Sequence, residues 1–260
     1  MEIVDLRGRK GLVVGIANEH SLAWSSAQHF HSAGAELAVT YLNDKAKPYV
    51  EPLARQLEAA LFLPCNVALA GQLEAVFNTI KEKWGRLDFL LHSIAWARKE
   101  DLHGRLTDCS AEGFGESMFI SCHSFIHMAK LAEPLIGNGG SLITMSFYGA
   151  EKVVDHYNVM GPVKAALEAS VRYLAHELGP KGIRVNAISA GAVATRAASG
   201  IEHFDELLNE TARKAPLRRT VDSCEVGRAA LWLASDYATA ITGEVLHVDS
   251  GFHIEGMVFH

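Results

Sequence analysis

Seven short apolar runs alternate with amphipathic stretches along this chain. Each run is rich in β-branched or aromatic residues, which is typical of a strand. The runs are GLVVGI (11–16), ELAVTYL (36–42), ALFLPCNV (60–67), LDFLLHSIA (87–95), SLITMSF (141–147), IRVNAIS (183–189) and GEVLHVDS (243–250). Between them, apolar residues recur at helical spacing. Helices are expected near residues 22–33, 46–59, 70–84, 111–135, 159–178 and 222–234.

This alternation predicts a parallel sheet. The apolar runs are continuous, as in strands that are covered on both faces, and helices separate them. We therefore expect an α/β fold of the Rossmann-like, doubly wound type, with a seven-stranded sheet and ligands at the carboxyl ends of the strands. The segment from about 192 to 220 interrupts the alternation and is rich in small residues. We expect it to form a small substrate lid.

Composition fits one compact domain over residues 1–260. The chain is 49% hydrophobic and 21% charged, which suits a single buried core. The net charge of -6 argues against a nucleic-acid partner. Four cysteines without a C-x-x-C pair predict a reduced, cytoplasmic protein. We expect no signal peptide and no membrane span. We also expect no metal site, because the 13 histidines show no ligand spacing.

The turn after the first run is a candidate phosphate site. Gly15 would let the backbone approach a pyrophosphate, and Ser21 would cap the next helix, whose first amides attract phosphate. The G-x-G-x-x-G pattern is absent, so an ordinary tight turn between strand and helix stays an alternative. The second run ends without an acidic residue or an arginine pair, although Lys45 and Lys47 follow. NADH is slightly favoured, and NADPH stays an alternative.

Two further strand ends are expected beside a dinucleotide. Cys65, Asn66 and Val67 would meet the adenine, and Ser93, Ile94 and Ala95 would line the nicotinamide side. Simple loop packing is the alternative for these small residues.

The candidate catalytic pair is Tyr157 and Lys164, seven residues apart. On one helix this spacing is about two turns, so both side chains would emerge on one face. A phenol beside an ammonium can donate a hydrogen bond to an oxygen that gains negative charge. A core tyrosine and a snorkelling lysine are the alternative. Because Pro162 is tolerated only in a first turn, we expect regular helix to start near Val159.

A rival pair, Tyr148 and Lys152, has the Y-x-x-x-K spacing of ordinary short-chain alcohol dehydrogenases. Those enzymes normally carry a serine about thirteen residues before the tyrosine, and this chain has Leu135 there. Lys152 also opens no long helical pattern.

These motifs together resemble the enoyl-[acyl-carrier-protein] reductases of bacterial fatty-acid synthesis, a divergent branch of the short-chain dehydrogenase/reductase superfamily. The combination of G-x5-S-x-A with Y-x6-K is more specific than either half. The matching segments are GIANEHSLAW (15–24), TYLNDK (40–45), LHSIAWA (91–97), YNVMGPVKAALEASVRYLA (157–175), GIRVNAISAG (182–191), AASGI (197–201) and GEVLHVDSGF (243–252).

The resemblance implies roles for matching residues. Tyr157 is similar to the catalytic tyrosine and Lys164 to the ribose-binding lysine. Ala97, Phe147 and Tyr157 are implied to contact the acyl substrate. The implied cofactor contacts are Gly15, Ser21, Leu22, Asn66, Val67, Ile94, Lys164, Val193, Ala194, Thr195, Arg196 and Ala197.

Some positions depart from the family pattern. Phe147 stands where many relatives have a second tyrosine, and Tyr148 comes one step later. Other departures are Ser25 in place of a glycine, Asn66 of an aspartate, Ala192 of a proline and Arg196 of a leucine. These changes leave the acyl chain length and the role of Arg196 open.

The activity that the resemblance implies is NADH-dependent reduction of the 2,3 double bond of a trans-2-enoyl thioester on acyl-carrier protein. It also implies a homotetramer. One alternative is a carbonyl or alcohol dehydrogenase acting on another small substrate. A non-catalytic NAD(P)-binding regulator is the other, because Phe147 and Pro162 are unusual.

Overall fold

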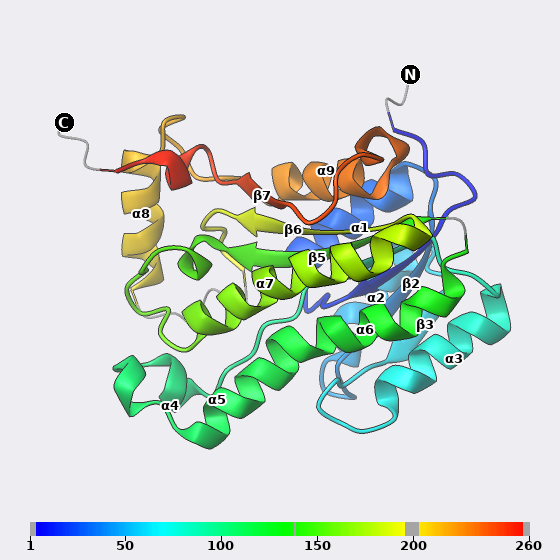
Figure 1. Cartoon of the computed structure of the whole chain (residues 1–260), viewed down its shortest axis with the longest axis horizontal. Coiled ribbons are helices and arrows are strands. Elements are labelled where there is room, and N and C mark those ends of the chain that lie inside the picture. Colours follow the sequence, from blue (N-terminus) through cyan, green and yellow to red (C-terminus); the bar gives the residue numbers. More distant parts are fainter. Residues whose placement is uncertain (1–3, 138, 196–202, 257–260) are drawn as a thin grey trace.

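The sheet at the centre of the molecule has seven parallel strands in the order β3-β2-β1-β4-β5-β6-β7 (Figure 1). The computed structural model describes residues 4–137, 139–195 and 203–256. The strands are β1 (Lys10–Val14), β2 (Glu36–Tyr41), β3 (Leu61–Pro64), β4 (Phe89–His92), β5 (Gly140–Phe147), β6 (Ile183–Ala190) and β7 (Val245–Val248). All seven predicted strands and the doubly wound α/β fold are confirmed.

Strand side chains pack into two separate hydrophobic cores, one on each face of the sheet. In β1, Leu12 and Val14 belong to one buried cluster and Val13 belongs to the other. This alternation follows from the two-residue period of a strand. Since both faces are covered, the strands need apolar residues at nearly every position, as their sequences show.

Helices cover both faces of the sheet (Figure 1). The cluster that contains Leu12 includes residues of α3, α6 and α7, and the cluster that contains Val13 includes residues of α1, α2 and α9. The helices are α1 (Leu22–Ser32), α2 (Lys47–Gln56), α3 (Gln72–Trp84), α4 (Lys99–Leu102), α5 (Ala111–Met118), α6 (Ser124–Ala132), α7 (Met160–Leu178), α8 (Phe204–Lys214) and α9 (Ser223–Ala234).

The predicted helix over 111–135 is one helical path with an irregular centre. A π-helical turn, η2 (Phe119–His123), joins α5 to α6. Within this turn, the Ser121 hydroxyl accepts a hydrogen bond from Trp96 N and donates one to Trp96 O. The irregular turn therefore ties the helix to the loop that follows β4, a contact between residues 25 apart in the chain. Helical periodicity gives no sign of it.

The predicted lid segment contains α8, which stands beyond the carboxyl ends of β5 and β6 (Figure 1). Residues 196–202 of this segment lie outside the described residues. No helix in the described part of the chain combines the length and the apolar character that a bilayer crossing needs.

Candidate active site

The strand order reverses between β1 and β4, and the carboxyl ends of the strands at such a switch point are where doubly wound folds bind ligands. Gly15 follows β1 with φ of 114°, and a Cβ at this position would lie 2.1 Å from the carbonyl oxygen of Ser93. Ser93 N also donates a hydrogen bond to Val14 O. Only glycine allows this approach. The two predicted cofactor segments, at Gly15 and at Ser93 and Ile94, are therefore brought together.

Ser21 occupies the N-cap position of α1 but does not cap the helix through its side chain. Its hydroxyl accepts hydrogen bonds from the amides of Ala17 and Asn18 and donates one to Asn18 O. The expected side-chain cap is wrong. The turn after Gly15 folds back toward α1, so its backbone amides occupy the Ser21 hydroxyl in place of the first amides of the helix. Ser21 thus shapes the loop between Gly15 and α1.

The ends of β2 and β3 lie on the same side of the switch point. Asn66 follows β3, where its backbone amide donates to Gln72 Oε1 and its side-chain oxygen accepts from Ala68 N. At the end of β2, the Tyr41 ring packs against Phe62 in a tilted contact with centroids 4.6 Å apart. Lys47 Nζ lies 5.7 Å from the Tyr41 ring centre. The lysine is therefore held over an aromatic face.

Tyr157 is not on the same regular helix as Lys164, contrary to the expectation from their spacing. The helix α7 begins at Met160, with Val159 at its N-cap, so the predicted start near Val159 is confirmed. Tyr157 belongs to the preceding turn, between His156 and Asn158, which both have positive φ. Asn158 Nδ2 donates to the carbonyls of Leu102 and Gly104 and so anchors this turn. The position of the phenol is therefore set by a turn.

The Tyr157 side chain is buried against the end of β5. Its ring meets Phe147 in an edge contact with centroids 4.8 Å apart. A Cβ at Gly149 would lie 2.4 Å from Tyr157 Cδ1, so only glycine leaves room for the ring. Burial raises the pKa of Tyr157 well above its usual range, and the Glu168 carboxylate adds to this rise. The phenol therefore stays protonated and can act as a donor.

Lys164 lies in the first turns of α7, with only 4% of its surface exposed. Its Nζ donates a hydrogen bond to Met145 O, on β5, at 2.7 Å. Burial lowers the pKa of Lys164 to about 8, whereas Cys122 and Glu168 oppose that change. At neutral pH the side chain is therefore an ammonium group close to the end of β5, which leads directly to Phe147.

Buried polar groups that the sequence analysis missed lie on the strands beside this pair. His92 Nδ1 is 2.8 Å from Thr144 Oγ1, and His92 Nε2 is 2.9 Å from Ser124 Oγ. Since Ser124 Oγ donates to Ile120 O, it accepts from His92 Nε2–H, and Nδ1 accepts from Thr144. Burial, and next the Lys164 charge, lower the pKa of His92 to about 3, so the ring is neutral.

Glu168, four residues after Lys164, is a second missed group and accepts a hydrogen bond from Ser146 Oγ. A carboxylate on an otherwise apolar helix face was the sequence signal for it.

The other predicted site residues are divided between the two faces of the sheet. Val67, Ile94, Ala97 and Phe147 all pack against the buried cluster that contains Tyr157. Leu22 and Val193 pack instead against the cluster on the opposite face of the sheet. Ala194 is exposed and Thr195 is half-buried. Arg196 and Ala197 lie outside the described residues.

The two residues of the rival pair, Tyr148 and Lys152, are not buried together. The Tyr148 ring makes an edge contact with Phe252, at 5.5 Å between centroids. Lys152 is exposed in a bend and precedes no helix. The short-chain dehydrogenase spacing at these residues therefore corresponds to no buried pair.

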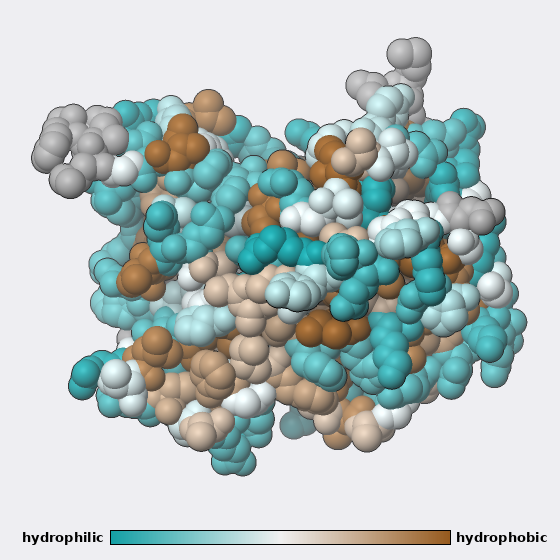
Figure 2. Space-filling view, in the orientation of Figure 1, coloured by the Kyte–Doolittle hydropathy of each residue, from teal (hydrophilic) through white to brown (hydrophobic). Residues whose placement is uncertain are grey.

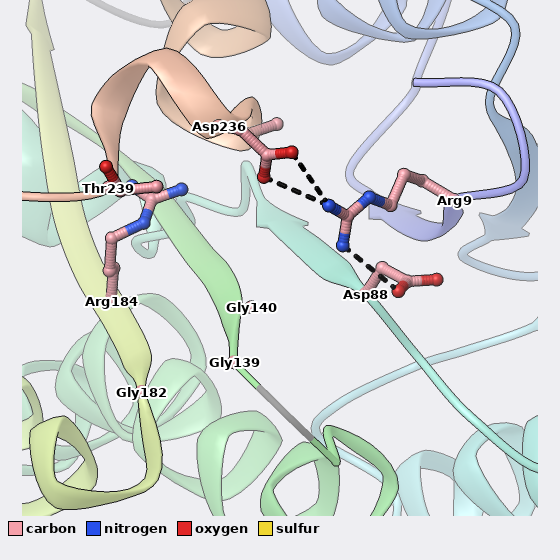
Figure 3. Close-up of a pocket in the computed structure, with 9 residues that line it drawn as sticks. Arg9, Asp88, Gly139, Gly140, Gly182, Arg184, Asp236 and Thr239 are labelled. Atoms are coloured by element: carbon pink, nitrogen blue, oxygen red, sulfur yellow. Dashed lines mark hydrogen bonds and ion pairs between the residues drawn. The ribbon is translucent and has the colours of Figure 1, made fainter. Parts of the chain in front are cut away.

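A cavity of about 250 Å³ lies at the amino ends of the strands, away from this site (Figure 3). Arg9 points into it and lies between Asp88, at 3.6 Å, and Asp236, at 3.0 Å (Figure 3). Arg184 donates to the carbonyl of Leu233. Both guanidinium groups therefore already have partners within the protein, and their interactions connect the segments that surround the cavity. Within the described ranges, no group of three or more His, Cys, Asp or Glu side chains is arranged to hold a metal ion.

The residues present fit a dinucleotide. The glycine turn at Gly15 packs against Ser93, it leads into the N-terminus of α1, and polar groups follow the end of β3. All three lie at the carboxyl ends of neighbouring strands, where a doubly wound fold binds the pyrophosphate and adenine of a dinucleotide.

A sequence profile described as Enoyl-(Acyl carrier protein) reductase matches residues 15–253. Among curated proteins, the chain is 50% identical over 252 residues to "Enoyl-[acyl-carrier-protein] reductase [NADH] 1" of Rhizobium meliloti (strain 1021), covering 97% of this chain and 93% of that protein.

Solved structures agree with this match. The enoyl-(acyl-carrier-protein) reductase of Anaplasma phagocytophilum in complex with NAD superposes with a TM-score of 0.94 at 50% identity, covering 99% of this chain and 98% of the other. The Bacillus cereus enoyl-acyl carrier protein reductase with NADP+ and indole naphthyridinone gives 0.95 at 45% identity, covering 98% and 100%.

Proposed function

This chain belongs to the enoyl-(acyl carrier protein) reductase family, and from this premise we propose that Tyr157 and Lys164 carry its reaction. The enzyme is an NADH-dependent oxidoreductase of fatty-acid synthesis that reduces the 2,3 double bond of a trans-2-enoyl thioester. The observation that supports the two residues is their joint burial at the end of β5, with a protonated phenol and a charged ammonium.

Each residue has one task in the proposed reaction. NADH, when bound, supplies the hydride that the β-carbon of the substrate accepts. Negative charge then develops on the thioester oxygen, and the Tyr157 hydroxyl donates a hydrogen bond to it. The Lys164 ammonium fixes the ribose hydroxyls and favours the anionic oxygen. Protonation at the α-carbon completes the reduction.

The cofactor contacts belong to the same proposal. Gly15, Ser21 and Leu22 would hold the pyrophosphate, and Asn66 and Val67 the adenine. Ile94, together with Val193 to Ala197, would line the nicotinamide, and Ala97 and Phe147 would meet the acyl chain. The contact of Phe147 with Tyr157, and the packing of Ile94 and Ala97 against the core on the same face of the sheet, support these roles.

We also propose acyl-carrier protein as the carrier of the substrate, a cytoplasmic location and a homotetramer. The whole chain would form one catalytic domain with α8 in its lid. Large apolar side chains that stay exposed on α5, η2 and α7 support the tetramer: Phe114, Phe119 and Tyr173. Figure 2 shows apolar surface over these elements, in the lower middle of the view.

Replacing Tyr157 with phenylalanine tests the proposal. We expect Tyr157→Phe to lose about 3–4 kcal/mol of barrier lowering, or roughly two to three orders of magnitude in kcat, because the oxyanion loses its donor. NADH oxidation with crotonyl-CoA measures this loss, and NADH fluorescence checks that the cofactor still binds.

Tyr148→Phe is the matched control, since Tyr148 contacts Phe252 and lies outside the proposed pair. It should keep most of the activity. Full activity in Tyr157→Phe together with loss in Tyr148→Phe would reverse the assignment. Turnover of ketones in place of enoyl thioesters would favour a carbonyl dehydrogenase, and tight NADH binding without any turnover would favour a regulator.

A further inference from the structure

We propose that Glu168 is a positioning residue for this reaction: it holds the end of β5 against α7 and serves as the counter-charge of the Lys164 ammonium. The proposal rests on the proposed roles of Tyr157 and Lys164 and extends them to a residue behind them. Glu168 lies about one helical turn after Lys164 and is 5% exposed. A buried carboxyl group is costly unless it is paired or hydrogen-bonded, so its presence calls for a specific partner.

Glu168 and Lys164 hold adjacent residues of one strand. Ser146 Oγ donates a hydrogen bond to Glu168 Oε1, and Lys164 Nζ donates one to the carbonyl of Met145. The next residue along β5 is Phe147, whose ring contacts Tyr157. Two side chains of α7 therefore fix the strand directly before the residue that touches the catalytic phenol.

Several charged or titratable groups face this pair from other elements. Burial raises the pKa of Glu168, and the hydrogen bond from Ser146 opposes that rise. His247 Nε2 lies 2.9 Å from Glu151 Oε1, so these two form an ion pair when the imidazole is protonated. The groups that act on Glu168 or Lys164 are Cys122 (η2), Glu151 after β5, Arg172 (α7) and His247 (β7), and the charge of Lys164 acts on His92 (β4).

The consequence is a link between Glu168 and the pH at which Lys164 loses its proton. Lys164 and Glu168 are four residues apart on α7, so their side chains lie on one face of the helix, and each is bonded to the end of β5. A carboxylate near an ammonium favours the charged form. Burial already brings the pKa of Lys164 down to about 8, and Glu168 limits that fall. Without the carboxylate, the ammonium should deprotonate at lower pH, and ribose binding and oxyanion stabilisation should weaken with it.

Substitutions at Glu168 and Ser146, with a control at Glu177, separate the two parts of this role. Glu168→Gln keeps an oxygen that can accept from Ser146 but removes the charge. Ser146→Ala removes the hydrogen bond and keeps the carboxylate. Glu177→Gln, at an exposed position near the end of the same helix, is the matched control. Each variant is compared with the wild type by kcat/KM on crotonyl-CoA and by the Kd of NADH between about pH 6 and pH 10.

We expect Glu168→Gln to move the alkaline limb of both profiles to lower pH by about one unit, a tenfold effect at the most affected pH. Glu177→Gln should leave both limbs in place. Glu168→Asp keeps the negative charge and should therefore shift the limbs less than Glu168→Gln does. Ser146→Ala should lower kcat with little change in the limb. Thermal unfolding of each variant confirms that it is folded.

Wild-type profiles in Glu168→Gln would overturn the proposal, and so would an equal shift in Glu168→Asp. Should the wild type fail to reduce enoyl thioesters, the proposed function is wrong, whereas the NADH-binding profile still decides whether Glu168 is the counter-charge of Lys164.

Discussion

Burial sets the protonation states of the residues around the end of β5. It keeps the Tyr157 phenol protonated and the His92 ring neutral, and it brings the pKa of Lys164 close to the physiological range. All three effects have the same cause, since a low-dielectric interior disfavours the charged form of each group. For the phenol this outcome suits a hydrogen-bond donor, and for the lysine it creates a dependence on nearby carboxylates.

His92 gives a stability prediction at the same scale. Its folded-state pKa of about 3 lies below the usual 6.5, so the unfolded state binds the extra proton. The contribution of the neutral ring to the free energy of unfolding is therefore fully present above pH 6.5. It decreases as the pH drops from 6.5 toward the folded-state pKa of about 3. Over the first two units, we expect a loss of about 3 kcal/mol from the free energy of unfolding.

Urea unfolding of the wild type and of His92→Gln, at fixed protein concentration, measures this dependence. The variant keeps an amide that can bond Thr144 and Ser124, and its stability should depend less on pH in this window. Equal slopes for the two proteins would show that His92 is not the group responsible.

At the scale of elements, close helix contacts depend on small residues. On α9, a Cβ at Gly227 would lie 2.7 Å from His29 Nδ1 and 2.9 Å from Ser25 O, both on α1. Helix α9 starts with a capping box, in which Asp222 accepts from the first turn and Glu225 reaches back to Asp222 N. The cap fixes where α9 begins, and the glycine lets it lie directly on α1.

Gly227→Ala should therefore destabilise the protein by about 1–3 kcal/mol, because the backbone of α1 cannot move away freely. Gly115→Ala in α5 is the control, since no atom lies within 4 Å of the added Cβ. It should be neutral or stabilise the helix by up to about 1 kcal/mol. Chemical denaturation of both variants decides this, and a Gly227→Ala variant as stable as the wild type would contradict the close contact.

At the scale of the whole molecule, the sheet gathers residues from distant parts of the chain at one edge. Because every strand runs in the same direction, all carboxyl ends meet there, and the strand order reverses between β1 and β4. The helix layers leave Phe119 and Tyr173 exposed by 46% and 73%, and the elements that carry them, η2 and α7, are in contact. This surface is where we expect neighbouring subunits to pack.

Phe119→Glu should weaken that assembly and shift the protein from a tetramer to smaller species, because a buried charge without a partner is costly at an interface. Sedimentation velocity measures the distribution. Tyr49→Glu is the control, since Tyr49 is 65% exposed on α2, away from this face. An unchanged tetramer in Phe119→Glu, or a monomeric wild type, would contradict the proposed interface.

The sequence alone determined the strands and most helices. Apolar periodicity is local, so it located all seven strands, and Pro162 correctly limited the start of α7. The resemblance in motifs identified the family. Helix α4 is too short for such a pattern, and the π-helical turn at η2 depends on a contact with a distant loop.

The tertiary structure decided how the site is held. Tyr157 lies in a turn anchored by Asn158, whose partners are more than 50 residues away, so helical spacing misplaced it. The hydrogen bonds of His92 and Glu168 join residues 52 and 22 apart. Such bonds form only when strands and helices pack and exclude water, and no local pattern of hydrophobic and polar residues encodes them.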